Sequence, residues 1–269
     1  AIISVILFSL FLVTSFDSDF YHYQHIRWNE EYPVIPGLGN FEDRYGFNSN
    51  YFLLSAIFSF RFIFTDAVYT LQGLIFTLLL SWAFVKFFLE KSNISYLVFI
   101  ILLFTFLLIG KNFLDNTSTD IIPHLCILYY IVKTVTKPQC LKDQSLFAFI
   151  LPVTLITFKL STITFCIVVL VVLIYLMRDK NYKAISFLFS FSFLIVVLWC
   201  VRNVIITGYL VYPVYAIDLF SFDWKMPKVV LMLQKKYIHD FAMAAGTHNF
   251  FDNILTLEIN AISFNLLLR

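Results

Sequence analysis

Residues 67–89 read AVYTLQGLIFTLLLSWAFVKFFL, an apolar run of 23 residues in which Lys86 is the one charged side chain. At a rise of about 1.5 Å per residue, a helix of this length crosses the roughly 30 Å hydrocarbon core of a bilayer. The run is continuous rather than alternating between polar and apolar residues, which excludes a porin-like barrel. The stretch therefore predicts a transmembrane helix in an all-α, polytopic membrane protein.

The composition of the whole chain supports the same class. Of the 269 residues, 60% are hydrophobic and 13% are charged, about half the charged fraction of a soluble domain. This excludes a disordered chain, a small disulfide scaffold and an ordinary cytosolic enzyme. The net charge of +2 comes without a basic patch, so no nucleic-acid partner is expected. The four scattered cysteines predict neither a disulfide framework nor a metal site.

Further apolar runs predict about seven transmembrane helices in a single domain over residues 1–269. The first run, 1–13, is short and is interpreted as the second half of a truncated helix in a fragment that lacks both ends. Residues 51–65 are interrupted by Arg61, and we expect them to lie in the membrane interface rather than to span. The remaining predicted spans cover residues 94–109, 121–135, 146–158, 162–177 and 184–201.

The charges of the loops predict the orientation. Residues 14–66 contain seven acidic and three basic side chains, whereas three later loops contain eight basic and three acidic ones. The positive-inside rule therefore places those three loops in the cytoplasm. The predicted outer segments are then 14–66, 110–120, the tip 159–161 and 202–269. The eight basic residues are Lys86, Lys91, Lys133, Lys137, Lys142, Arg178, Lys180 and Lys183.

The predicted outer segment contains an unusual cluster of ionisable residues, DSDFYHYQHIRWNEEY at 17–32. Carboxylates and histidines next to a membrane helix can deprotonate a hydroxyl or hold a divalent cation. In an α-helix, Asp19, His22 and His25 would share roughly one face. The alternative is a solvated interfacial helix whose aromatic residues form a belt and whose charges face water. The candidate residues in this cluster are Asp17, Asp19, His22, His25 and Glu31.

Other polar residues lie on the same predicted side. Asn40 is the last residue of the PGLGN turn and could contact a sugar or a phosphate, and Asp120 begins a helix in the second outer segment. Lys159 and Arg202 sit at predicted outer ends of spans, where each could bind a phosphate. The alternatives are turn chemistry for the glycines, helix capping for Asp120, and headgroup anchoring for the two cations.

Several of these segments together resemble a family of uncharacterised bacterial multi-pass membrane proteins. The resemblance rests on Asp17, Tyr21 and His22, on Trp28 and Glu31, on PGLGN, on the Asn48–Ser49 pair, and on the later segments TFKLS and VRNVIITGYLVYP. These proteins look like C-type (GT-C) glycosyltransferases, which use polyprenyl-phosphate-linked sugars.

The resemblance implies roles for particular residues. The catalytic base or metal ligand would be Asp17, with Asp19 as second choice, and Asp120 would be the acidic residue of the second outer segment. Lys159 or Arg202 would hold the donor phosphate in one pocket with Asp17. The implied cofactor is a divalent cation, Mg or Mn, with Asp17 and Asp120 as its candidate ligands. The tandem acidic motif of oligosaccharyltransferases is absent from the sequence.

The expected function is therefore an inverting glycosyltransferase in the bacterial inner membrane, with loop 14–66 outside. It would move a sugar from the lipid-linked donor to an acceptor hydroxyl in cell-surface glycan synthesis, with membrane lipids as further partners. A surface polysaccharide polymerase or ligase would use the same carrier. A transporter or flippase of lipid-linked glycans would instead require ionisable residues near mid-membrane and repeated, broken helices. The predicted spans have few charges at their centres and show no repeat, which favours the enzyme.

Overall fold

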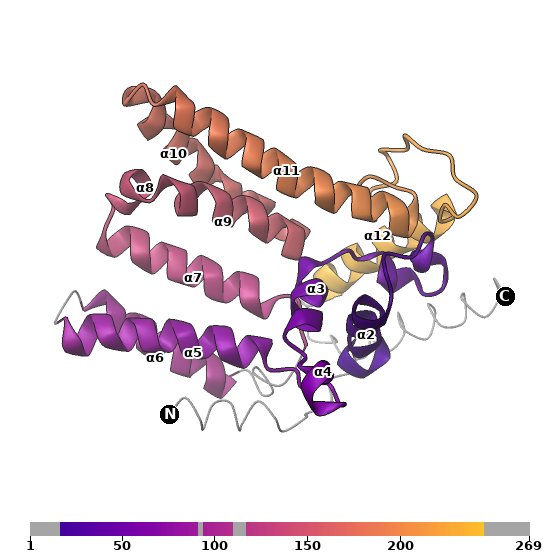
Figure 1. The fold of residues 1–269 in the computed structure, drawn as a ribbon, viewed down its shortest axis with the longest axis horizontal. Helices are drawn as coiled ribbons and strands as arrows, with labels where there is room; N and C mark the ends of the chain where they lie inside the picture. The colour runs from indigo at the N-terminus through magenta and orange to yellow at the C-terminus, as the bar shows by residue number, and fades with distance from the viewer. Residues whose placement is uncertain (1–16, 91–93, 110–116, 245–269) are drawn as a thin grey trace. The chain divides into compact units, whose positions relative to one another are not determined.

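The computed structural model describes residues 17–90, 94–109 and 117–244, and their regular structure is helical, with no strand among them (Figure 1). The chain divides into two compact units. The first takes its described residues from Ala1–Val34 and Asn48–Trp199, and the second from Ile35–Phe47 and Cys200–Arg269. The predicted truncated helix at 1–13 lies outside the described residues.

Three helices in the described part of the chain are long and apolar enough to cross a membrane: Leu71–Leu89, Leu160–Arg178 and Tyr182–Thr207. The first is α5 (Leu71–Phe84) continued by the π-helix η4 (Val85–Leu89), and the second is the 3-10 helix η5 (Leu160–Cys166) continued by α10 (Ile167–Arg178). The third is α11. The prediction of about seven spans is therefore corrected to three by this criterion.

The remaining apolar helices of the described chain are too short to cross a membrane by the same length criterion. They are α6 (Ser95–Ile109), α7 (Ile121–Thr136) and α9 (Ser145–Phe158), of 15, 16 and 14 residues. Such helices are roughly 21–24 Å long, less than the roughly 30 Å of a hydrocarbon core. The predicted runs 94–109, 121–135 and 146–158 have nearly the same bounds as these helices, so the sequence located the helices and their shortness alone excludes them by the length criterion.

The core of the first unit is built from aromatic and aliphatic side chains between these helices. Helix α7 packs against α5 and α6 and also against α9, which in turn packs against α10. Trp82 of α5 meets Tyr129 of α7 edge to face, with ring centroids 4.6 Å apart. The fully buried side chains nearby include Phe76, Phe99, Leu103, Leu125, Tyr130 and Phe149.

The predicted outer segment of the first unit forms short helices. The π-helix η1 (Ser18–His22) leads into α2 (Tyr23–Glu31), which packs against α3 (Asn50–Ile57). The run 51–65 does not form one helix, because Phe60 adopts φ +52° between α3 and α4 (Arg61–Phe64). Both helices are too short to span, and α4 exposes a row of apolar side chains, Phe62, Ile63 and Phe64.

The second unit joins a loop from the first predicted outer segment to the chain that follows α11. It contains the 3-10 helices η2 (Leu38–Asn40) and η3 (Asp43–Gly46), the end of α11 and helix α12 (Lys228–Ala244). Gly37 has φ +72°, and a Cβ there would lie 2.8 Å from the Cβ of Trp224, so both conformation and space require glycine. The unit's core is formed by Tyr209, Tyr212, Met226 and Leu231.

Candidate functional site

A buried hydrogen-bond network joins the two predicted outer segments of the first unit. The Thr117 hydroxyl donates to the Ser18 hydroxyl at 2.9 Å, and the Thr117 backbone N–H contacts the same oxygen at 3.3 Å. The Nδ1 atom of His22 lies 3.2 Å from the Thr117 hydroxyl. All three residues are buried, so the hydrogen bonds compensate their desolvation and fix one segment against the other.

The π-helical turn sets which side chains of the first segment face inward. A π-helix has more residues per turn than an α-helix, so the face expected from α-helical spacing is not kept. His22 and His25 are buried, whereas Asp17 and Asp19 are exposed. The interpretation that Asp19 shares a face with the two histidines is therefore wrong. Single turns of π-helix occur frequently at functional sites.

The two buried histidines rest on an aromatic surface. The His25 ring stacks on Phe52 of α3, with centroids 4.4 Å apart and an interplanar angle of 27°. The His22 ring lies 5.2 Å from the same Phe52 and meets Tyr21 edge to face at 4.3 Å. The histidines thus hold α2 against α3 and leave the exposed carboxylates on the other side of the turn.

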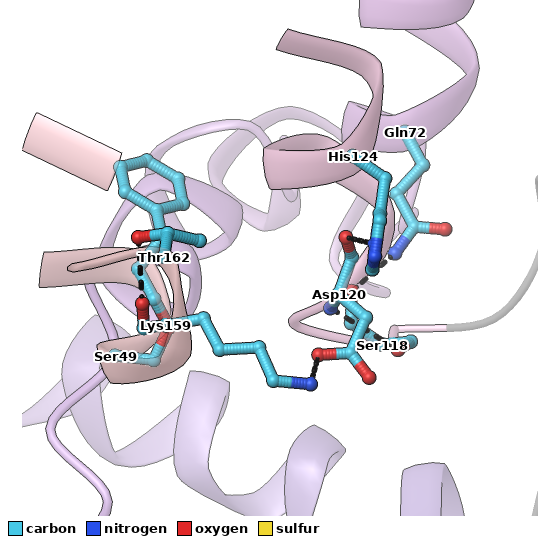
Figure 2. Close-up of polar contacts among 8 residues, drawn as sticks. Ser49, Gln72, Ser118, Asp120, His124, Lys159 and Thr162 are labelled. Carbon is cyan, nitrogen blue, oxygen red and sulfur yellow. Dashed lines mark hydrogen bonds and ion pairs between the residues drawn. The ribbon is translucent and has the colours of Figure 1, made fainter. Parts of the chain in front are cut away.

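Three residues after Thr117, Asp120 forms an ion pair with Lys159 (Figure 2). Asp120 precedes α7, and Lys159 lies in an extended conformation between α9 and η5. Their side chains are 42% and 38% exposed, so the pair is open to solvent and to a ligand. The Nδ1 atom of His124 lies 2.6 Å from the backbone oxygen of Asp120, one helical turn away.

The backbone on both sides of this ion pair is held by further hydrogen bonds. On the Asp120 side, Gln72 of α5 donates to the Ser118 carbonyl at 2.8 Å and contacts the Tyr51 hydroxyl at 3.3 Å. On the Lys159 side, the Thr162 hydroxyl donates to the Lys159 carbonyl at 2.8 Å. Burial raises the pKa of the Tyr51 phenol well above its ordinary value, so Tyr51 stays a neutral partner for Gln72.

The ion pair and the exposed carboxylates therefore belong to one end of the first unit. Asp17 adjoins Ser18, and Ser18 bonds to Thr117, which leads to Asp120. This region can supply a carboxylate as a base and an ammonium group as an anion partner. Glu31, another predicted site residue, is exposed and pairs with Arg27 at 2.7 Å, as expected for a solvated helix surface.

Two predicted site residues lie in the second unit. Asn40 is exposed and donates from Nδ2 to the backbone oxygen of Trp224 at 2.6 Å, which is a turn-stabilising contact. Arg202 is 9% exposed near the end of α11. The shared pocket for Arg202, Lys159 and Asp17 stays a prediction, because Arg202 belongs to a different unit from the other two.

A divalent cation does not fit the side chains of the described residues. No group of three or more His, Cys, Asp or Glu side chains in residues 17–90, 94–109 and 117–244 is placed to hold a metal ion. Asp120, one of the two candidate ligands, is already paired with Lys159. Hard cations such as Mg²⁺ require several oxygen ligands, and the described side chains do not supply them at one place.

Two parts of this region are not evident from the sequence. Gln72 could have been predicted to have a buried partner. It is an amide within the apolar run 67–89, and such residues are costly in lipid unless they are paired. Thr117 and Ser18 give no such indication, since hydroxyl residues are common beside helix ends. Their partnership depends on tertiary packing over 99 positions of sequence separation.

Comparison with known proteins identifies a family. A family model described as a domain of unknown function, DUF8201, matches residues 1–261. No curated protein and no solved structure matches the chain. Because the family model covers nearly all of the 269 residues, the chain belongs to the DUF8201 family.

Proposed function

We propose that this protein is a C-type membrane glycosyltransferase that moves a sugar from a polyprenyl-phosphate-linked donor to an acceptor hydroxyl. The reaction would take place at the outer face of the bacterial inner membrane, in the synthesis of a cell-surface glycan. The apolar helices support membrane association, and the resemblance to C-type enzymes gives the class of donor. The shorter helices α6, α7 and α9 would complete the membrane domain by crossing where the bilayer is locally thin.

The observation that carries the proposal is the hydrogen-bonded junction of the two predicted outer segments. The Ser18–Thr117 bond brings the exposed carboxylate of Asp17 to the same end of the unit as the Asp120–Lys159 pair. A base and a cation at one end of an apolar helix bundle suit a donor with a lipid tail and a charged phosphate. An interfacial helix that only faces water would need no such junction between distant segments.

In the proposed reaction, Asp17 accepts the proton of the acceptor hydroxyl while the hydroxyl oxygen attacks the anomeric carbon of the donor. A new carbon–oxygen bond forms, and the bond between the anomeric carbon and the phosphate oxygen breaks. The polyprenyl phosphate leaves with the electron pair, and the configuration at the anomeric carbon is inverted. Asp19 is the second candidate for the base, since its side chain is exposed two residues after Asp17.

Lys159 has the role of stabilising the phosphate. Negative charge grows on the leaving oxygen in the transition state, and an ammonium group aimed at it lowers the barrier. In the free protein Lys159 is held in place by Asp120. Donor phosphate would compete with this carboxylate for the ammonium group, so Asp120 positions the cation before the donor binds.

Asp17→Asn tests the proposal. The amide preserves size but cannot take a proton, so the variant should stay in the membrane and lose transfer from polyprenyl-phosphate hexoses supplied one at a time. The matched control is Asp66→Asn, which removes another exposed carboxylate of the same predicted outer segment and should leave transfer unchanged. Full activity of Asp17→Asn would pass the role to Asp19, and full activity of both single variants and the double variant would overturn the proposal.

A further inference from the structure

The second unit contains a pair of acidic side chains. Glu42 and Asp43 are consecutive residues at the start of η3, and both are half-buried. Burial, a side-chain hydrogen bond with Asp43 and the charge of Asp43 raise the pKa of Glu42 to about 7, from an ordinary value of 4.5. The pair therefore exchanges a proton near neutral pH and can both donate and accept hydrogen bonds.

The hydroxyl end of Tyr212 is directed at this turn. Tyr212 is 5% exposed, and its hydroxyl makes no hydrogen bond within the described chain. A Cβ at Gly46, which ends η3, would lie 2.9 Å from the Cζ atom that carries this hydroxyl. Burial and the charges of Asp43 and Glu42 raise the pKa of the phenol well above 10, so it remains a neutral donor beside the acids. A buried phenol without a partner is costly, so a ligand group that supplied an acceptor to this hydroxyl would be favoured.

Helix α12 closes the other side of the turn. The Gln234 amide donates from Nε2 to the Asp43 carboxylate. Tyr237 lies three residues later, on the same helix face, and its ring centroid is 5.7 Å from the Arg44 guanidinium carbon. An amide, two carboxyl groups, a phenol and an aromatic ring are thus arranged around one short turn.

We propose that Glu42, Asp43, Tyr212 and Gln234 form a binding site for a neutral, hydroxyl-rich ligand such as a sugar. The charge of Arg44 offsets that of Asp43, so the turn offers little net attraction to an ion. Hydroxyl groups, in contrast, match side chains that donate and accept hydrogen bonds at once. A few converging polar groups beside an aromatic ring are typical of small-molecule sites.

Binding of methyl glycosides to the purified full chain tests this site, in a detergent that carries no sugar headgroup. Saturation-transfer NMR should detect at least one methyl hexoside bound to the wild type. Tyr212→Phe and Glu42→Gln should each weaken that binding about tenfold, the effect expected for one lost hydrogen bond to a charged or buried group. Asp223→Asn, which changes an exposed acid of the same unit, should bind like the wild type.

The test concerns binding alone, so its outcome is separate from that of the transfer assay. If Tyr212→Phe fails to fold, as judged by its circular dichroism, Glu42→Gln and Gln234→Ala decide the question. Equal binding by these variants and the wild type would overturn the proposal. So would the absence of binding by every methyl hexoside, or binding of Ca²⁺ or a primary amine in place of the glycosides.

Discussion

Lys159 and Asp120 in the first unit meet as opposite charges, whereas Glu42 and Asp43 in the second unit are like charges held side by side. The opposite pair is open to solvent on both partners, and its attraction is weakened by water and salt. The like pair is half-buried, so repulsion and desolvation are relieved by keeping a proton on Glu42. In the opposite pair, Lys159 can exchange its carboxylate partner for another anion. In the like pair, the charge of Glu42 changes with pH.

The largest effect on stability is expected from Gly46→Val in the like-charge turn. A Cβ at Gly46 would lie 2.9–3.0 Å from three atoms of the buried Tyr212 ring, which cannot move without disturbing the core. Such overpacking costs about 1–3 kcal/mol, which thermal unfolding in detergent should register as a lower midpoint. The double variant with Tyr212→Leu should recover part of the loss, and an unchanged midpoint for Gly46→Val would contradict the close contact.

Thr117→Val probes the junction that supports the opposite pair. Valine keeps the shape but removes the hydroxyl that contacts Ser18 and His22, so we expect a loss of about 1–2 kcal/mol. The control is Thr119→Val, which changes a half-exposed hydroxyl two residues away. Equal midpoints for the two variants would mean that the junction contributes nothing measurable.

Glu42→Gln should change how the free energy of unfolding depends on pH, which distinguishes the like-charge pair from the opposite pair. The pKa of Glu42 is raised in the folded state, so its contribution is complete below about pH 4.5 and is lost as the pH rises through about 7. Because Glu42 is only half-buried, solvent screening reduces the effect, and the wild type should lose on the order of 1–2 kcal/mol between about pH 5 and about pH 8, whereas Glu42→Gln should lose less. The charged or titratable groups facing Glu42 are Asp43, Arg44 and Tyr212.

Unfolding midpoints at the two pH values measure this difference, with Asp223→Asn as the carboxylate control. A pH dependence that Glu42→Gln leaves unaltered would assign the effect to another group. It would also remove the contrast between the two charge pairs, because the like pair would then titrate as an ordinary surface carboxylate does.

The smallest effect on stability is expected at the opposite pair itself. Lys159→Met and Asp120→Asn should each change the free energy of unfolding by about 0–1 kcal/mol, since both partners are well exposed. Donor binding should respond differently, with about a tenfold loss in Lys159→Met and a partial loss in Lys159→Arg. A double-mutant cycle on stability with a coupling well above 1 kcal/mol would show that the pair is structural rather than exchangeable.

The sequence predicted the long helices well, because continuous apolar runs and their length determine them. The predicted runs 67–89, 162–177 and 184–201 lie within or overlap the three long apolar helices of the structure. The irregular parts could not be predicted in the same way. The positive φ of Phe60 divides 51–65 into two helices. The sequence does not predict this break, because position 60 is neither a glycine nor a proline.

In the site too, local sequence indicates single candidate residues, whereas their contacts depend on packing between distant segments. The sequence indicates Asp120 and Lys159 as candidate site residues on separate grounds. Asp120 is an acid at the start of a helix, and Lys159 is a cation in apolar surroundings. That they pair with each other follows from the packing of α7 beside α9, which sequence spacing does not reveal. His22 and His25 were expected beside Asp19, but the π-turn directs them into the core, and helix periodicity assumes the wrong number of residues per turn.

The end of α9 has a consequence for how the protein meets the bilayer. The Ser49 hydroxyl donates to the Phe158 carbonyl at 2.6 Å, and Asn50 donates to the Thr157 hydroxyl at 2.7 Å, so the last turn of α9 receives donors from the chain that begins α3. A terminal carbonyl such as that of Phe158, which accepts a hydrogen bond from protein, does not need a water partner. In the proposed membrane domain, the protein donors at this end would let the short helix α9 cross a locally thin bilayer without extending further to reach water.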